Sequence, residues 1–213
     1  MNIVILGTGH LGSWLAAILT RNTQHKVAVY DISIDRCQKL DNVEILNTLD
    51  EIGAFKPEIV INAVSLNKTK EVFDAVLPFL SEDCMISDVA SVKTGLADYY
   101  DKIKRPYVST HPMFGPTFAN FKNLSNENAI IITEGCIKGK EFFKGLYKDL
   151  SLNIFEYSFV EHDRTIAYSL GTPFTATMVF SACMEKQDAP GTTFRKHMLI
   201  AEGLLKEDDY LLA

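Results

Sequence analysis

Polar residues that could do chemistry gather in two segments of the sequence, Ser87–Lys93 and Ser109–Pro116. In the second segment, the proline after His111 keeps the histidine backbone out of the helical region, and imidazole exchanges protons near neutral pH. Such a side chain suits the base that takes a hydroxyl proton while a hydride leaves an alcohol carbon. Ser91 could orient that proton or bind the substrate, and Lys93 could present a cation to a carboxylate. The alternatives are a structural histidine, a helix N-cap at Ser91 and a solvated or cofactor-contacting Lys93.

A hydride acceptor is indicated by the motif GTGHLG, which directly follows the apolar run at the start of the chain. Gly7 permits a tight turn, Gly9 lets the backbone approach a pyrophosphate, and Gly12 lets the next helix pack closely on the strand. The start of that helix presents unpaired N–H groups to phosphate. We therefore expect a dinucleotide to contact this turn, including His10 and Leu11.

Asp31 ends the second predicted strand, where it could accept hydrogen bonds from the ribose hydroxyls of the cofactor. A carboxylate there repels a 2′-phosphate, and Arg36 is offset from it, so the sequence favours NAD, with NADP as the alternative. FAD and a glycine turn without a ligand are less favoured. Ala63, Val64 and Ser65 follow the fourth predicted strand at the edge that the cofactor crosses, and we expect backbone contacts there.

The elements that must position these residues alternate between strands and helices. The expected strands span 2–6, 26–30, 43–46, 59–63, 85–88, 107–110, 129–133 and 153–157, and the expected helices between them span 11–20, 68–80, 93–102 and 139–150. This order predicts an α/β fold of the Rossmann type, with a doubly wound, mainly parallel sheet. Because the carboxyl ends of parallel strands meet at one edge, the glycine turn and both chemical segments should share that edge.

From Phe159 onward the sequence shows only helical periods, so we predict a dinucleotide-binding domain at residues 1–158 and an all-helical domain at 159–213. The helical domain is short for an independent core, and it is rich in apolar side chains. It should therefore pack on the sheet domain or form a core with a second chain. The second option predicts a homodimer that forms through the helical domain. We expect this domain to bind the substrate and to be incomplete.

Composition narrows the function classes further. The net charge is −6 and the isoelectric point is near 5.4, which argues against nucleic acid or an anionic membrane as the main partner. The start of the chain lacks the pattern of a signal peptide, and no apolar run is long enough to cross a bilayer. The four cysteines are scattered without a CxxC pair, so we expect neither a metal site nor disulfides, and a reduced, cytoplasmic protein.

In this order, the segments GTGHLG, SDVASVK, STHPMFGP, EHDRTIAYS and APGTTFRKH resemble the prephenate dehydrogenase family of tyrosine biosynthesis, over nearly the whole chain. The resemblance implies NAD(P)-dependent oxidative decarboxylation of prephenate to 4-hydroxyphenylpyruvate. It also implies that His111 takes the proton of the C4 hydroxyl while C4 gives up its hydride. Ser91 matches the family serine that orients this histidine and the substrate.

The chain departs from the family pattern in its helical part. Phe174 stands where many members carry a histidine, and Leu199 aligns with the arginine that binds a substrate carboxylate. Arg195, one helical turn earlier on the same face, is our candidate to replace that arginine. His162 and Asp163 match a family pair, for which dipole complementation at a helix start is the alternative. The chain also ends at Ala213, sooner than the family's helical domain.

Three other functions remain open on the sequence alone. Arogenate dehydrogenases run the same reaction on a substrate with an amino group on its side chain. The chain could also be another β-hydroxyacid or imine reductase of similar architecture, but that function would not explain why His111 stands in the segment HPMFGP. A non-catalytic NAD(H)-binding regulatory module would fit the departures in the helical part.

Overall fold

A single eight-stranded sheet lies at the centre of the computed structural model, which describes residues 1–22, 24–115, 120, 123–185 and 187–204. Pro116 of the second chemical segment and residues 205–213 of the predicted helical domain lie outside the described residues. The strands are β1 (Asn2–Leu6), β2 (Lys26–Tyr30), β3 (Glu44–Leu46), β4 (Ile59–Asn62), β5 (Met85–Asp88), β6 (Tyr107–Pro112), β7 (Asn128–Ile132) and β8 (Asn153–Tyr157).

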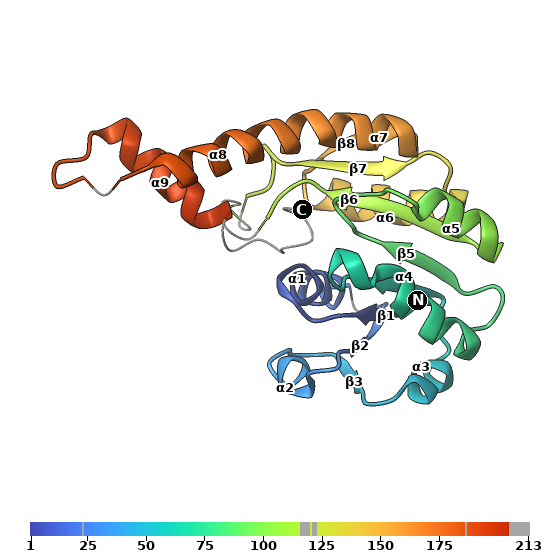
Figure 1. Cartoon of the computed structure of the whole chain (residues 1–213). Coiled ribbons are helices and arrows are strands. Elements are labelled where there is room, and N and C mark those ends of the chain that lie inside the picture. Colours follow the sequence, from blue (N-terminus) through green and yellow to red (C-terminus); the bar gives the residue numbers. More distant parts are fainter. Residues whose placement is uncertain (23, 116–119, 121–122, 186, 205–213) are drawn as a thin grey trace.

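The strand order is β3-β2-β1-β4-β5-β6-β7-β8 (Figure 1). All neighbouring strands from β3 to β6 run parallel. β7 runs antiparallel to β6, with Thr110 opposite Ile131 and His111 opposite Ile130, and β8 is again parallel to β7. The predicted Rossmann-type, mainly parallel sheet is therefore confirmed, with one antiparallel pair at β6–β7.

Helices cover both faces of the sheet. One face carries α1 (His10–Leu19), α2 (Ile34–Cys37) and α6 (Ile137–Asp149), and the other carries α3 (Leu49–Phe55), α4 (Thr69–Val76), α5 (Leu96–Ile103) and α7 (Phe159–Ile166). Within β1, Ile3 and Ile5 belong to the core of the first face, whereas Val4 and Leu6 belong to the core of the second. This alternation follows from the two-residue period of a strand, and it explains why a strand buried on both faces reads as continuously apolar.

Two short helices of the structure were not among the elements expected from the sequence, α2 and α3. α3 begins at a polar cap, where the Thr48 hydroxyl accepts a hydrogen bond from the Glu51 N–H at 3.3 Å. The predicted helix over 68–80 is divided into 3₁₀ turns at Leu66–Lys68 and Leu77–Phe79 around α4. The helix expected from residue 93 begins instead at Leu96, after Gly95 in the left-handed region at φ +72°.

The helical end of the chain starts on the sheet and then leaves it. Ser158 and Glu161 form a capping box at the start of α7, and Phe159 of this helix belongs to the core of the second face of the sheet. A π-helical turn (Ala167–Gly171) leads into α8 (Thr172–Cys183), which is followed by α9 (Thr192–Leu204).

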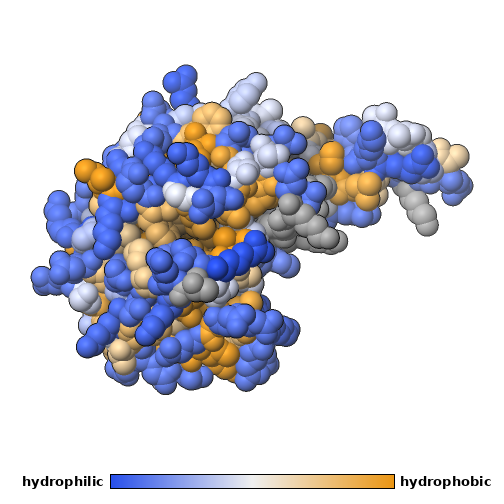
Figure 2. All heavy atoms as spheres, turned by 180° about the vertical axis from the view of Figure 1, so that it is seen from behind, coloured by the Kyte–Doolittle hydropathy of each residue, from blue (hydrophilic) through white to orange (hydrophobic). Residues whose placement is uncertain are grey.

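α8 and α9 project beyond the sheet (Figure 1), and Figure 2 shows apolar surface on this projection. α8 has no buried residue. The domain boundary expected at 158/159 remains a prediction. Within the described residues, no helix is both long and apolar enough to cross a membrane.

Candidate active site at the carboxyl ends of the strands

The glycine turn between β1 and α1 is as tight as the motif requires. Gly7 has φ +88°, and a Cβ there would lie 3.0 Å from the Ala63 carbonyl oxygen. A Cβ on Gly12 would lie 1.9 Å from the Gly7 carbonyl oxygen, so only glycine lets α1 approach the strand this closely. A Cβ on Gly9, in contrast, would meet no atom within 4 Å. The space over Gly9 is thus open to a ligand, and it fits the pyrophosphate of a dinucleotide.

Asp31 follows β2 and holds this turn in place. Its Oδ2 accepts hydrogen bonds from Thr8 N at 2.7 Å and Thr8 Oγ1 at 2.9 Å, and its Oδ1 accepts one from Ser33 N at 2.8 Å. Burial acts to raise the pKa of Asp31, but the hydrogen bonds from Thr8 and Ser33 outweigh it and lower the pKa. The carboxylate is therefore ionised beside the turn, and its Oδ1, which accepts only one of these three hydrogen bonds, keeps a lone pair for a hydroxyl group.

The loop after β4 lies against the same turn. Ala63 N donates to Leu6 O at 2.8 Å, and a Cβ on Gly12 would lie 3.3 Å from Ala63 Cβ. A Cβ on Gly7 would lie 2.9 Å from Val64 Cγ1, so Val64 is packed closely on the turn. Ser65 is exposed in the same loop, next to this contact. The structure thus brings this loop together with the glycine turn.

His10 and Leu11 begin α1 on the other side of that turn. His10 is exposed at the first position of the helix, and Leu11 is partly buried against the core. Their contact with a cofactor remains a prediction.

Lys93 is buried inside the sheet domain, at 1% exposure, and forms an ion pair with Asp88. Its Nζ also donates to the Thr110 carbonyl oxygen at 2.8 Å, while Tyr100 OH donates to the other Asp88 oxygen at 2.6 Å. Burial lowers the pKa of Lys93, and the neighbouring Asp88 opposes this shift. The ammonium is enclosed and already paired, which does not favour the expectation that Lys93 presents its cation to a substrate carboxylate; that role stays a prediction.

His111 lies at the end of β6 and is buried to 8% exposure, on the same edge as the glycine turn. Its Nδ1 is 3.0 Å from Nε2 of His162 in the first turns of α7, and His162 is fully buried. His162 Nδ1 is in turn 2.9 Å from Asp163 Oδ1. The structure thus places two polar side chains, His162 and Asp163, in line behind His111, and the sequence identified both only through the family resemblance.

Both histidines of this line are neutral near pH 7. Burial, the Lys93 ammonium and His162 lower the pKa of His111 well below its ordinary value. Burial also lowers the pKa of His162, although its hydrogen bond with Asp163 opposes the shift. A neutral, enclosed imidazole has the properties of a proton acceptor at physiological pH.

Asp163 ties α7 to the loop between β5 and α5. Its Oδ1 accepts a hydrogen bond from Lys93 N at 3.0 Å, and its Oδ2 accepts one from Thr94 Oγ1 at 3.1 Å. The cap of α7 is Ser158, so Asp163 is not needed as the helix cap. Dipole complementation therefore does not account for its contacts, which instead fix the loop that carries Ser91.

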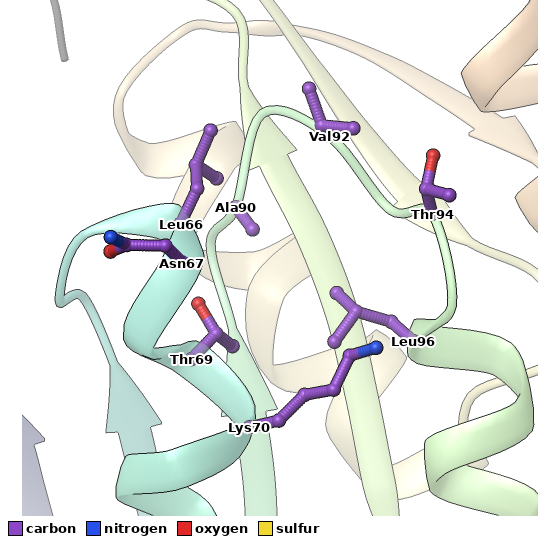
Figure 3. Close-up of a pocket in the computed structure, with 8 residues that line it drawn as sticks. All are labelled: Leu66, Asn67, Thr69, Lys70, Ala90, Val92, Thr94 and Leu96. Carbon is purple, nitrogen blue, oxygen red and sulfur yellow. The ribbon is translucent and has the colours of Figure 1, made fainter. Parts of the chain in front are cut away.

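Ser91 is partly exposed in that loop. It is not a helix N-cap, because the cap residue of α5 is Gly95. The alternating residues Ala90, Val92 and Thr94 line a pocket of about 190 Å³ between this loop and the start of α4 (Figure 3). Lys70 extends across this pocket in Figure 3, and a Cβ on Gly95 would lie 2.7 Å from its Nζ. A role for Ser91 toward His111 remains a prediction.

Arg195 lies exposed on α9 in the projecting part of the chain. Among the described residues, no hydrogen bond or ion pair joins its guanidinium to the segments that carry Ser91 and His111. Phe174 is partly buried on α8, and Leu199 is exposed on α9. The contacts among the described residues thus do not join Arg195 to His111, and the role of Arg195 remains a prediction.

Comparison with known proteins agrees with this geometry. Residues 15–152 match the family model described as prephenate dehydrogenase, nucleotide-binding domain. The chain belongs to the prephenate dehydrogenase family. The resemblance drawn from the motifs is thereby confirmed. The matched range includes the β5–α5 loop and His111, and it ends before His162.

One relative in this family is a probable arogenate/prephenate dehydrogenase of Methanocaldococcus jannaschii, 31% identical over 153 residues. The match covers 69% of this chain and 33% of the relative, so the chain spans about a third of that protein's length.

Two solved structures share the fold. A prephenate dehydrogenase of A. aeolicus, in complex with hydroxyphenyl propionate and NAD+, has a TM-score of 0.82 at 20% identity, covering 100% of this chain and 80% of that chain. The arogenate dehydrogenase of Synechocystis has a TM-score of 0.75 at 19% identity, with coverages of 100% and 81%.

Proposed function

We propose that this protein catalyses the NAD-dependent oxidative decarboxylation of prephenate to 4-hydroxyphenylpyruvate, a step of tyrosine biosynthesis. The observation that carries this proposal is the neutral, buried His111 at the same sheet edge as the open glycine turn. Membership of the family supports the reaction class, and the burial and lowered pKa of His111 support its role as the acceptor for the hydroxyl proton.

The cofactor that fits the turn is NAD. Its pyrophosphate would lie over Gly9 at the start of α1, and its adenosine ribose would face the ionised Asp31. The same carboxylate would repel the 2′-phosphate of NADP. Calorimetric titration should therefore show tighter binding of NAD⁺ than of NADP⁺. An Asp31→Asn variant should narrow that difference, and equal affinities in the unchanged protein would contradict the assignment.

In this reaction NAD⁺, when bound, accepts the hydride from C4 of the substrate ring. His111 accepts the C4 hydroxyl proton as the hydride departs, and Ser91 orients the hydroxyl toward it. The ring carboxylate then leaves as CO₂, and the proton held at His111 returns to the phenolate oxygen of the aromatised product. Because aromatisation drives the reaction, the main task of these side chains is to align C4 and hold the proton.

The decisive experiment follows NADH absorbance with prephenate and with arogenate, each in the presence of NAD⁺ or NADP⁺. We expect turnover with NAD⁺ and prephenate, and a His111→Asn variant should lose about 10²-fold or more in kcat. A matched control is His25→Asn, since His25 precedes β2 at the opposite edge of the sheet. Turnover with arogenate instead would identify the alternative substrate. No turnover with any pair, despite NAD⁺ binding, would identify a non-catalytic module.

Arg195 is our proposal for the cation that binds a substrate carboxylate. It lies on the same helix as Leu199, one turn away, and it is exposed for such a contact. An Arg195→Ala variant should raise KM for the substrate more than it lowers kcat. Unchanged KM would contradict the assignment, and Arg164 and Lys196 would then be the next cations to test.

We also propose that α8 and α9 pair with those of a second copy. Apolar side chains on these helices are exposed in the single chain, including Val179 at 59% and Leu199 at 62%. Apolar surface of this kind is typical of an interaction site. Light scattering after gel filtration should give the mass of a dimer, and a monomer at micromolar concentration would contradict the proposal.

The four cysteines, all without disulfides, are consistent with a reducing compartment such as the cytoplasm.

A further inference from the structure

The contacts among His111, His162 and Asp163 also indicate which ring nitrogen of each histidine carries a proton. His162 is fully buried between its two partners, with contacts of 3.0 Å to His111 Nδ1 and 2.9 Å to Asp163 Oδ1. Each imidazole uses one nitrogen toward the next member of the line. The position of one proton therefore restricts the positions of the others.

The order of donors along the line is set by Asp163. Its carboxylate already accepts hydrogen bonds from Lys93 N and Thr94 Oγ1, and an ionised carboxylate can only accept. His162 must therefore donate its Nδ1–H to Asp163, which leaves its Nε2 as an acceptor. His111 must then donate its Nδ1–H to His162, and the lone pair of His111 remains on Nε2.

We propose that His162 and Asp163 are positioning residues that hold His111 in the tautomer with a proton on Nδ1 and a bare Nε2. In the opposite tautomer, Nε2 would carry a proton and could not accept one from a substrate hydroxyl. The reversed line would also turn the bare Nδ1 of His162 toward the Asp163 carboxylate, where two lone pairs would face each other. This inference rests on the proposed function for its catalytic meaning, but the tautomer itself is a property of the protein without substrate.

The line also connects the two segments that the sequence singled out. Asp163 accepts from the backbone of Lys93 in the β5–α5 loop, and His162 contacts His111 at the end of β6. α7 therefore fixes the orientation of the His111 ring and, through the same carboxylate, the loop that carries Ser91. Loss of the hydrogen-bond acceptor at either residue of α7 should alter proton acceptance at His111, although neither side chain touches the substrate.

The test uses a pair of variants at one position. In His162→Gln, the side-chain oxygen can stand near the place of Nε2 and accept the His111 proton. In His162→Leu, no acceptor remains. Two-bond ¹⁵N–¹H correlation spectra of the imidazoles, recorded without substrate, report which ring nitrogen carries the proton. The signals of His111 are assigned by their loss in His111→Asn.

We expect the unchanged protein and His162→Gln to show His111 protonated on Nδ1, and His162→Leu to show the Nε2–H tautomer at a substantial fraction. In turnover, kcat should fall by about 10²-fold in His162→Leu, with a smaller change in KM, and His162→Gln should recover most of it. A His111 protonated on Nε2 in the unchanged protein would overturn the inference, even if the leucine variant failed to fold. So would a folded leucine variant with unchanged tautomer and kcat.

Asp163 offers a second, independent pair. In Asp163→Asn, the hydrogen bond from Lys93 N keeps the amide oxygen on the side that also accepts from His162, so the His111 tautomer should persist. In Asp163→Ala, the acceptor is lost and the tautomers should mix. If the tautomer is as inferred but no substrate turns over, the proposed function fails and the positioning role stands. If turnover is normal with the opposite tautomer, only the positioning role fails.

Discussion

The sheet domain and the projecting helices α8 and α9 differ in how far their apolar and charged side chains are buried. In the sheet domain even a lysine is enclosed, because Lys93 is paired with Asp88 inside the protein. On α8 no residue is buried, and Val179 and Leu199 are largely exposed. The sheet domain thus builds its core within one chain, whereas α8 buries none of its side chains.

This difference separates the two halves of the proposed chemistry. The groups for cofactor binding and proton acceptance are fixed by contacts within the sheet domain and α7. The predicted contact to a substrate carboxylate lies on α9, where the single chain fixes little. Each of the following experiments tests one side of that comparison.

The largest effect is expected from Lys93→Met, which leaves the Asp88 carboxylate buried without its cation. Breaking a buried pair in this way should lower the free energy of unfolding by about 3–5 kcal/mol, measured by urea denaturation. Lys68→Met is the matched control, because Lys68 forms an exposed pair with Glu71 and should change stability by less than about 1 kcal/mol. Equal losses in both variants would mean that the sheet domain does not depend on its buried pair.

Gly12→Ala and Gly9→Ala should separate the structural glycine from the glycine at the ligand. A methyl group on Gly12 would collide with the Gly7 carbonyl, so stability should fall by about 1–3 kcal/mol and NAD⁺ binding should weaken. Gly9→Ala meets no protein atom, so its melting temperature should stay near that of the unchanged protein while NAD⁺ affinity falls. Unaltered NAD⁺ affinity in Gly9→Ala would place the pyrophosphate elsewhere.

Mild acid should destabilise the sheet domain through its two buried histidines. Because the pKa of His111 and that of His162 are lowered in the fold, the unfolded chain binds more protons than the folded chain below about pH 6.5. Stability should therefore fall as the pH decreases from 6.5 toward 5, by up to about 1.4 kcal/mol per pH unit for each histidine. Lys93, Asp88 and Asp163 are the charged groups near this pair.

Urea denaturation at several pH values measures this slope. The same series on His111→Asn should be flatter between pH 6.5 and 5, since one of the two groups has been removed. An identical slope in the variant would show that His111 is not held neutral by the fold.

The smallest effect on stability is expected on the projecting helices. Leu199→Lys places a charge on a side chain that is already exposed, so the free energy of unfolding of a single chain should change by less than about 0.5 kcal/mol. The same variant should shift the molar mass from dimer to monomer if α8 and α9 form the contact between copies. A loss of stability without a change in mass would mean that Leu199 packs within its own chain.

The sequence predicted most of the sheet domain because its signals are local. All eight strands were expected near their observed positions, since buried strands such as β1 are short apolar runs ending in turn residues. The helices α2 and α3 were missed because they are short and their apolar periodicity is weak. The reversed direction of β7 was not anticipated either, since strand direction depends on the path of the connection from His111 to Asn128.

The candidate site divides in the same way. By itself the sequence determined that Gly7 and Gly12 form a tight turn beside Asp31, because residue type and spacing there follow from the backbone geometry of one strand, turn and helix. Only the tertiary structure decided that Lys93 faces inward to Asp88 and that His162 lies behind His111. His111 and His162 are 51 residues apart in the chain, so their contact depends on how α7 packs on the sheet. Asp88 and Lys93 are only five residues apart, but the direction of the Lys93 side chain depends on how the β5–α5 loop packs on the sheet.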